Sequence, residues 1–528
     1  MTLEPTPVPD PPHDTGARRK LLMQGLTWSV VYKVIETGAS FAAMLVLARL
    51  IAPSEYGRAA AAVGFLNFVN SFGAHLIIGH ALQLSDREEP DWSMYWSLTG
   101  YFQVTLFLSC HLLAVMCRSW PQYAPVAPLL HIAAFGMLLD WPGQIGMAML
   151  TRDLNFRRLK SVTTVSVMTK LATTIALAIG GMGAYAIVIG GNVIAAVAPA
   201  ADLLIVRRWR PRRGWLRVPG LGATRASLHF GGQQLLGTLT ATARSALEAA
   251  VLPAAVGFGG LGLWNRAQAL YGATAGRVTG VIMETAYPFL PRSRHDAPQF
   301  ERHATAFLQV TALLAISGAL FMGFEGRIVS RVLYGSRWTA MDPLIWWGAV
   351  VGLSTTIFGA CSIVLLAHGD LRACVVLDGV AALLAVPALI FALNTHVTLA
   401  YGIALAGCET LAMLFAVWNV VRIFGSRCLR PVFAPAATAG FAGSAGVLLA
   451  RMFASGLPGM PRTIVMAAVF FVAEFAALAL WHSATLGRLI DLTGLAAPVA
   501  RWLSTRGASL ATRSAETELV SKTPGPVV

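Results

Sequence analysis

Residues Ala304–Phe324, ATAFLQVTALLAISGALFMGF, form a run of 21 residues without an Asp, Glu, Lys or Arg. A helix needs about 20 apolar residues to cross the hydrocarbon core of a bilayer. Three further uncharged runs of comparable or greater length follow at 343–367, 379–408 and 432–450. Backbone groups in lipid have no water to bond, so each crossing segment must satisfy them internally as a helix. The chain is therefore predicted to be an all-α integral membrane protein.

Hydropathy divides the chain into about fourteen predicted spans. Their boundaries are 26–48, 58–83, 92–117, 126–150, 161–180, 184–206, 226–252, 258–287, 304–324, 343–367, 373–393, 396–421, 432–454 and 463–483. The composition agrees with a chain that consists largely of membrane spans, because 56% of the 528 residues are hydrophobic and only 12% are charged. Soluble domains carry roughly 25% charged residues.

The net charge of +15 does not indicate a nucleic-acid partner. The basic residues stand at the ends of apolar spans, where positive-inside sorting explains their excess, and no basic aromatic surface accompanies them. The six cysteines are scattered without CxxC pairs or metal-ligand spacing, so we expect buried thiols rather than disulfides or a metal site. GFGGLG at 257–262 satisfies GxGxxG but follows no strand, and we expect no cofactor.

Arginines gather in the connections after even-numbered spans. The segment 207–225, after the sixth span, contains seven of them, whereas the connection 180–184 after the fifth span has no charge. Because cytoplasmic connections are enriched in Arg and Lys, both termini are predicted to be cytoplasmic. The arginines at 327, 331 and 337, after the ninth span, depart from the pattern. No small-residue cleavage site follows the first span, so we interpret it as a retained signal anchor.

An internal repeat is predicted from a shared turn. Pro53–Gly57 follows the first span and Pro253–Gly257 follows the seventh, at an offset of 200 residues that also pairs Lys33 with Gln233. Six spans separate the copies, so the two halves run in the same direction. This order predicts two six-helix lobes in a parallel pseudo-twofold repeat, as in many alternating-access transporters, plus two C-terminal helices.

The expected domains follow from this repeat. They are a cytoplasmic N-terminal tail (1–22), an N-lobe of spans one to six (23–206), a basic cytoplasmic linker (207–225), a C-lobe of spans seven to twelve (226–424), spans thirteen and fourteen (425–485) and a cytoplasmic C-terminal tail (486–528).

Three motifs resemble those of the Wzx-type polysaccharide flippases, within the multidrug/oligosaccharidyl-lipid/polysaccharide exporter superfamily. LARLIAPSEYG at Leu47–Gly57 is similar to that family's "ARLLTPEEFG" turn and is the most specific of the three. The second is GLWNRA at Gly262–Ala267, followed by YPF at 287–289. The third is LYGSRW at Leu333–Trp338, leading into a span that ends with AHGD at 367–370.

The resemblance spreads from about residue 24 to residue 425. It implies a fourteen-helix, two-lobed protein of the bacterial inner membrane, with a MATE-like fold. It also implies transport of a polyprenyl-diphosphate-linked oligosaccharide between leaflets. Membrane lipid, a polysaccharide polymerase and the export machinery are the other expected partners. Family membership does not identify the sugar.

Charged side chains inside a span are expensive, by roughly 2.5–3.5 kcal/mol on insertion scales, and are therefore functional candidates. Lys33 and Glu36 lie on one predicted helix face, as do Arg244 and Glu248, and each pair is close enough for a local ion pair. The structural reading is that each pair fixes a helix contact. The functional reading places the cations in a cavity that attracts a diphosphate.

Further candidates share these two readings. Lys170 lies on a polar stripe with several Thr and Ser residues. Arg266 and Arg277 are candidates because guanidinium groups form bidentate contacts with phosphate. The substrate-binding candidates are Lys33, Glu36, Lys170, Gln233, Arg244, Glu248, Arg266 and Arg277. Buried acids can couple ion flow to transport or serve as helix contacts, and the candidates are Asp140, Asp378 and Glu409.

The predicted function is flipping of lipid-linked oligosaccharides through a cationic central cavity, without covalent chemistry. Two alternatives stay open. One is a membrane polymerase, ligase or glycosyltransferase acting on the same sugars, which would need a long extracytoplasmic loop rich in acidic, Arg or His residues; the longest here, near Glu325–Asp342, is short and lacks a carboxylate cluster. The other is a cation-coupled multidrug exporter, which should prefer an acidic cavity.

Overall fold

The computed structural model describes residues 15–73, 75–84, 88–212, 214, 216–286, 290–294, 296–453, 459–483 and 485. Side chains are described from residue 32 onward. The YPF motif at 287–289, most of the N-terminal tail and the C-terminal tail 486–528 lie outside the described residues. The described part contains helices and no strand, so the predicted all-α fold is confirmed.

The chain divides into two compact units, which are considered separately. Unit 1 is Met1–Asn265 with Leu389–Ala400, and unit 2 is Arg266–Ala388 with Tyr401–Val528. The division into lobes at 206 and 226 expected from the repeat remains a prediction.

The described residues of unit 1 form eight α-helices, two short π-helices and most of a ninth α-helix. They are α1 (Thr15–Leu50), α2 (Pro53–Asn70), α3 (His75–Gln83), α4 (Trp92–Ser119), α5 (Ala127–Arg152), α6 (Phe156–Ile179), α7 (Ala184–Val188), η1 (Ile189–Ile194), α8 (Ala195–Ala201), η2 (Asp202–Val206) and α9 (Leu221–Ala273).

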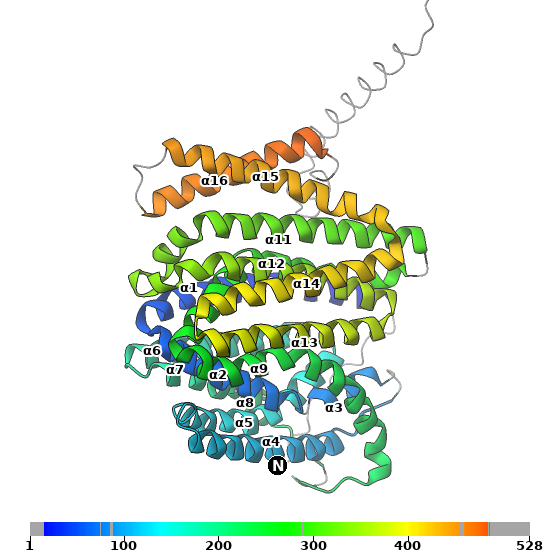
Figure 1. Ribbon diagram of the computed structural model, residues 1–528. Coiled ribbons are helices and arrows are strands. Elements are labelled where there is room, and N and C mark those ends of the chain that lie inside the picture. Colours follow the sequence, from blue (N-terminus) through cyan, green and yellow to red (C-terminus); the bar gives the residue numbers. More distant parts are fainter. Residues whose placement is uncertain are drawn as a thin grey trace, which may run out of the picture. The chain divides into compact units, whose positions relative to one another are not determined.

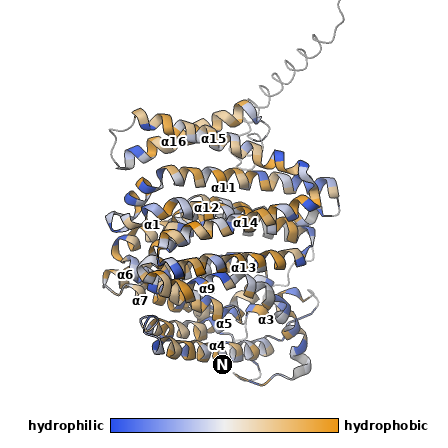
Figure 2. Ribbon diagram, in the orientation of Figure 1, coloured by the Kyte–Doolittle hydropathy of each residue, from blue (hydrophilic) through white to orange (hydrophobic). Residues whose placement is uncertain are grey.

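Unit 2 contains the end of α9 and the remaining helices. They are α10 (Ala275–Ala286), η3 (Leu290–Ser293), α11 (Ala297–Tyr334), η4 (Ser336–Leu344), α12 (Ile345–His368), α13 (Leu371–Thr395, whose last turns belong to unit 1), α14 (Thr398–Phe424), η5 (Ser426–Cys428), α15 (Leu429–Phe453) and α16 (Gly459–Trp481). Figure 2 shows that most of these helices are predominantly apolar.

Eleven helices in the described part are long and apolar enough to cross a membrane. The number is twelve if α2 and α3, which meet at a 48° bend, form one span. The protein is therefore a multi-pass membrane protein, and the count of fourteen remains a prediction. The described helices are fewer than the predicted spans partly because of α9, in which the predicted seventh and eighth spans are continuous across a break.

That break lies at Gly257, whose φ of +70° and ψ of 171° are not helical. Residues with a Cβ rarely adopt a positive φ, so the end of the Pro253–Gly257 turn depends on glycine. Pro253, one turn earlier, cannot donate a backbone hydrogen bond. His396 Nδ1 lies 2.9 Å from the carbonyl oxygen of Ala255, and the Tyr123 hydroxyl donates to the carbonyl oxygen of Ala250. The part of α9 before the break is thereby tied to other parts of unit 1.

Small residues on α5 let the segment 184–206 pack closely in unit 1. An ideal Cβ on Gly136 would lie 2.3 Å from the carbonyl oxygen of Asn192, so the backbones of α5 and η1 are in direct contact. Gly143 and Gly146, further along α5, meet Pro199 and Leu203. The other face of α5 packs along α4.

In unit 2, α11 is the central helix and contacts α10, α12, α15 and α16 (Figure 1). Arg451 on α15 reaches Glu325 on α11, with Nη2 and Oε1 2.9 Å apart. The Glu325 side chain is fully buried, so this pair joins α15 to the core of the unit.

Candidate functional site

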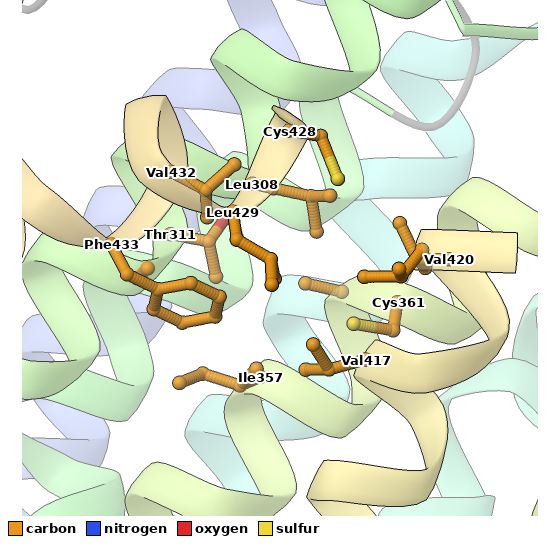
Figure 3. A pocket seen from close by; sticks show the side chains of 13 residues that line it. Leu308, Thr311, Ile357, Cys361, Val417, Val420, Cys428, Leu429, Val432 and Phe433 are labelled. Carbon is orange, nitrogen blue, oxygen red and sulfur yellow. The ribbon is translucent and has the colours of Figure 1, made fainter. Parts of the chain in front are cut away.

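An apolar void lies between α11, α12, α14 and α15 of unit 2 (Figure 3). Its walls include Leu308, Ile357 and Phe433, together with the thiols of Cys361 and Cys428. The void measures about 20 Å³, little more than one water molecule occupies. It is a packing gap and cannot hold a sugar headgroup. All six cysteines are free; four of them are buried as predicted, whereas Cys374 and Cys408 are partly exposed.

A polar cavity lies inside unit 1 and contains one of the predicted acids. Its volume is about 230 Å³, and Asp140 on α5 lines it. The opposite walls carry three amide side chains, from Asn67 and Asn70 on α2 and Asn192 on η1. The sequence singled out Asp140 by its charge alone. The asparagines give no such signal, because they carry no charge.

Two glutamines hold the Asp140 carboxylate. Nε2 of Gln103, on α4, lies 3.5 Å from Oδ2, and Nε2 of Gln144, one turn along α5, donates to the same oxygen. Gln103 has no exposed surface. The Oε1 atoms of both glutamines are buried and have no hydrogen-bond partner in the structure. His75 on α3 is close enough to interact electrostatically with Asp140.

The charged stripe of α1 faces α6. The hydroxyl of Thr164 donates to Oε1 of Glu36 over 2.8 Å, and α1 packs along α6. Lys33, one turn before Glu36, is half-buried. Lys170 on α6 is also half-buried. Lys33 and Lys170 thus lie on two helices in contact, and each belongs to unit 1.

Arg244 and Glu248 form the local ion pair that their spacing predicts. Nε of Arg244 and Oε1 of Glu248 are 3.7 Å apart, and the side chains are 30% and 15% exposed. Gln233, three turns earlier on α9, is exposed. Neither the apolar void of unit 2 nor the polar cavity of unit 1 is lined by Lys33, Lys170 or Arg244.

The remaining candidates lie in unit 2. Arg266, on the part of α9 after the break, is half-buried and interacts electrostatically with Tyr334, whereas Arg277 on α10 is exposed. Asp378 on α13 is half-buried, and Glu409 on α14 is 4% exposed. No described residues form a group of three or more His, Cys, Asp or Glu that could hold a metal ion.

Several arginines of the basic connections have defined structural roles in unit 1. Arg158 pairs with Asp202 at 2.9 Å, and Arg207 lies 3.8 Å from Asp153. Burial raises the pKa of Asp153 although Arg207 opposes the shift.

Arg152 donates to the carbonyl oxygens of Ala81, Leu84 and Glu88. The linker after η2 lies on α4, because the amides of Arg212 and Arg217 bond the hydroxyls of Ser93 and Ser97.

The motif at Leu47–Gly57 builds the junction between α1 and α2. Glu55 extends from α2 to the start of α7, where its Oε2 accepts a hydrogen bond from the amide of Ala184 over 3.0 Å. Arg58 pairs with the other oxygen of Glu55. Gly183, just before α7, has a positive φ of +49°. The motif thus joins the first helices to the segment 184–206.

Residues 46–343 match the model of a family described as "Polysaccharide biosynthesis protein", which is more than half of the chain. The chain belongs to this family. The match includes the motif at Leu47–Gly57 and most of the candidate residues, so the resemblance predicted from the three motifs is confirmed.

Two curated relatives have similar sequences. The succinoglycan biosynthesis transport protein ExoT of Rhizobium meliloti is 24% identical over 65% of this chain and 68% of its own length. The lipopolysaccharide biosynthesis protein WzxC of Escherichia coli is 20% identical over 64% of this chain and 68% of its own. Their names describe transport in succinoglycan biosynthesis and the biosynthesis of lipopolysaccharide.

The fold also resembles a solved structure of the lipid II flippase MurJ in an inward closed conformation. The TM-score is 0.68, and the alignment covers 87% of this chain and 100% of that chain at 13% sequence identity. At this identity the likeness concerns the fold alone.

Proposed function

We propose that this protein flips polyprenyl-diphosphate-linked oligosaccharide repeat units from the cytoplasmic to the periplasmic leaflet of a bacterial inner membrane. The observation that carries the proposal is the family match over residues 46–343, which falls on apolar helices with several charged side chains inside them. The name of ExoT as a transport protein for succinoglycan biosynthesis supports the same activity.

The physical problem is a hydrated, anionic headgroup that lipid rejects. A polar, cationic cavity replaces the water around the sugar and diphosphate, while the prenyl tail stays in lipid. Lys33, Lys170, Arg244, Arg266 and Arg277 are the side chains that supply positive charge to this cavity. Glu36, Gln233 and Glu248 orient these cations or bond sugar hydroxyls. Rocking of two lobes exposes the cavity to each side in turn.

The lobes of this mechanism are residues 23–206 and 226–424, joined by the basic linker 207–225, with both termini in the cytoplasm. The excess of Arg in that linker supports the orientation. No covalent step is required, so the protein acts as a transporter and not as an enzyme. Asp140, Asp378 and Glu409 are the candidates for ion coupling. A polysaccharide polymerase receives the flipped units on the periplasmic side.

A deletion strain tests the proposal. Loss of the protein should leave lipid-linked repeat units in the cytoplasmic leaflet, where mass analysis identifies the sugar, and a plasmid copy should restore export. Normal surface polysaccharide after deletion would contradict the proposal. Formation of glycosidic bonds by the purified protein would instead favour the enzyme alternative.

A further inference from the structure

The basic linker after η2 is held against the first turns of α4. The amide of Arg212 donates to Oγ of Ser93 over 3.0 Å, and the amide of Arg217 donates to Oγ of Ser97 over 3.3 Å. Both serines are buried. Trp209, near the start of the linker, packs against the aromatic side chains of α4. The linker binds the serines through its backbone, so these contacts do not use the arginine side chains.

The linker presents positive charges from this fixed backbone. Residues 207–225 contain seven arginines and no Asp or Glu. Five of the arginines have exposed side chains in the structure, namely Arg208, Arg210, Arg212, Arg217 and Arg225. Arg207 differs, because it is half-buried and lies 3.8 Å from Asp153. Guanidinium groups bind phosphate oxygens through two parallel hydrogen bonds, so this part of the linker is suited to a phosphate group.

An apolar groove begins one turn further along α4. It lies between α2 and α4 in unit 1 and has a volume of about 510 Å³. Aromatic side chains line it from both sides, with Phe68 and Phe72 at the end of α2 and Tyr101 and Phe102 on α4. Its eight lining residues, all within the described part of the chain, include no charged side chain. Such a groove favours a hydrocarbon chain over a charged or strongly hydrated group.

The linker and the groove share one ridge of α4. Side chains four positions apart lie one above the other on a helix. Ser93 and Ser97, which hold the linker, are followed at this spacing by Tyr101, Thr105 and Ser109, which line the groove. The step from Ser97 to Tyr101 is about 6 Å along the helix axis, at 1.5 Å per residue. The arginines therefore stand at one end of an apolar groove, as a phosphate group stands at one end of the acyl chains in a phospholipid.

We propose that this surface binds one anionic phospholipid, with its phosphate on the linker arginines and an acyl chain in the groove between α2 and α4. The positive charge of the arginines selects an anionic lipid over a zwitterionic one. Leu108 and Leu112 on α4 are 59% and 63% exposed, so the neighbouring face of this helix meets lipid in a membrane. Lys33 and Lys170, which are candidates for the substrate diphosphate, lie on α1 and α6 and are not part of this surface. The site goes beyond the proposed flipping activity, because a phospholipid is present whichever solute the protein moves.

Titration of the purified full-length protein in detergent with dioleoylphosphatidylglycerol, followed by native mass spectrometry, tests the site. Dioleoylphosphatidylcholine, which has the same chains and no net charge, is the comparison lipid, and we expect the first anionic lipid to bind more tightly. Arg212→Gln with Arg217→Gln keeps the backbone bonds to α4 and should weaken this binding about tenfold or more, because each arginine near an anionic lipid adds to the affinity. Arg427→Gln with Arg430→Gln removes the same charge from exposed arginines between α14 and α15 and should leave it unchanged.

Filling the groove tests the place of the acyl chain. Thr105 is exposed on α4, and its hydroxyl donates to the carbonyl oxygen of Tyr101 in the same helix. Thr105→Phe should weaken binding of the anionic lipid several-fold, because the new ring occupies the groove. Thr169→Phe on α6 is the matched control, since Thr169 is also exposed and its hydroxyl also donates to a carbonyl oxygen of its own helix.

Thermal unfolding and gel filtration show which variants are folded. If the paired linker variant does not fold, Arg208→Gln carries the charge test. Equal affinity of the wild type for the two lipids would overturn the proposal, as would an equal loss in the linker and control arginine pairs or an unchanged affinity in Thr105→Phe. The assay contains no lipid-linked sugar, so a protein that binds the anionic phospholipid but does not flip that sugar would refute only the proposed function.

Discussion

The α-carbon of Gly57 lies against the backbone of Phe258, so that an ideal Cβ on Gly57 would be 1.7 Å from the Phe258 carbonyl oxygen. The contact is reciprocal, because a Cβ on Gly262 would be 1.9 Å from the carbonyl oxygen of Pro53. The start of α2 therefore crosses α9 just after its break. The two turns that indicated the internal repeat, Pro53–Gly57 and Pro253–Gly257, lie side by side in unit 1.

Gly57→Ala should destabilise this crossing. The neighbouring atom is a backbone carbonyl, which cannot move aside as a flexible side chain can, and overpacking costs typically about 1–3 kcal/mol. We expect a lower thermal unfolding temperature in detergent and less protein in the membrane. Gly38→Ala on α1 is the control, because nothing lies within 4 Å of its Cβ position. Equal unfolding temperatures for the two variants would show that the crossing is not tight in the membrane.

Charge exchange at Arg244 and Glu248 separates the two readings of this ion pair. Arg244→Glu combined with Glu248→Arg keeps opposite charges at the same spacing, so a purely structural pair would be restored. We expect polysaccharide export to stay impaired, because the cation has moved one turn away from its place. Export is measured as surface polysaccharide per cell, at equal protein levels. Full export by the double variant would assign the pair to helix packing.

Neutralising Lys33 should also impair export. Lys33→Gln removes the positive charge but keeps a polar side chain, and we expect a several-fold decrease with little change in thermal stability. Lys160→Gln is the matched control, because it changes the net charge by the same amount. Lys160 lies near the start of α6. Undiminished export by the Lys33 variant would return this residue to a structural role.

Separating Glu325 from Arg451 should strongly destabilise unit 2. Glu325 is fully buried, and removing one partner of a buried ion pair costs about 3–5 kcal/mol. Arg451→Met alone leaves the carboxylate without its guanidinium, whereas Arg451→Met with Glu325→Gln removes both charges. We therefore expect the double variant to unfold at a higher temperature than the single variant. The reverse order would mean that the ion pair between Glu325 and Arg451 does not stabilise unit 2.

Glu55 should stabilise unit 1 through the start of α7. Glu55→Ala removes the acceptor of the Ala184 amide, and loss of such a cap costs roughly 0.5–2 kcal/mol. Glu55→Gln keeps an acceptor oxygen and should lose less. Thermal unfolding of the two variants measures the difference. Identical unfolding temperatures for Glu55→Ala and the wild type would show that this contact does not stabilise unit 1.

The helical class and the position of the break in α9 could be predicted from the chain, because they depend on local properties. Uncharged runs such as Ala304–Phe324 can satisfy their backbone in lipid only as helices. The turn Pro253–Gly257 combines a residue that cannot donate with one that accepts a positive φ. The spacing of Arg244 and Glu248 likewise predicted a pair that the structure contains.

The surroundings of these residues could not be predicted in the same way. Asp140 was singled out by its charge, but Gln103 and Asn192 are 37 and 52 positions away. Only the packing of α4 and η1 on α5 brings Gln103 to the Asp140 carboxylate and Asn192 to the cavity that Asp140 lines. Glu36 was expected to pair with Lys33 on its own helix. It also accepts a hydrogen bond from Thr164, which lies on another helix. Hydropathy and spacing along a helix act over a few residues, so the sequence determined that the chain crosses a membrane as helices and which charges it carries there. Contacts between helices depend on shape over long separations, so only the tertiary structure decided which polar groups share a cavity.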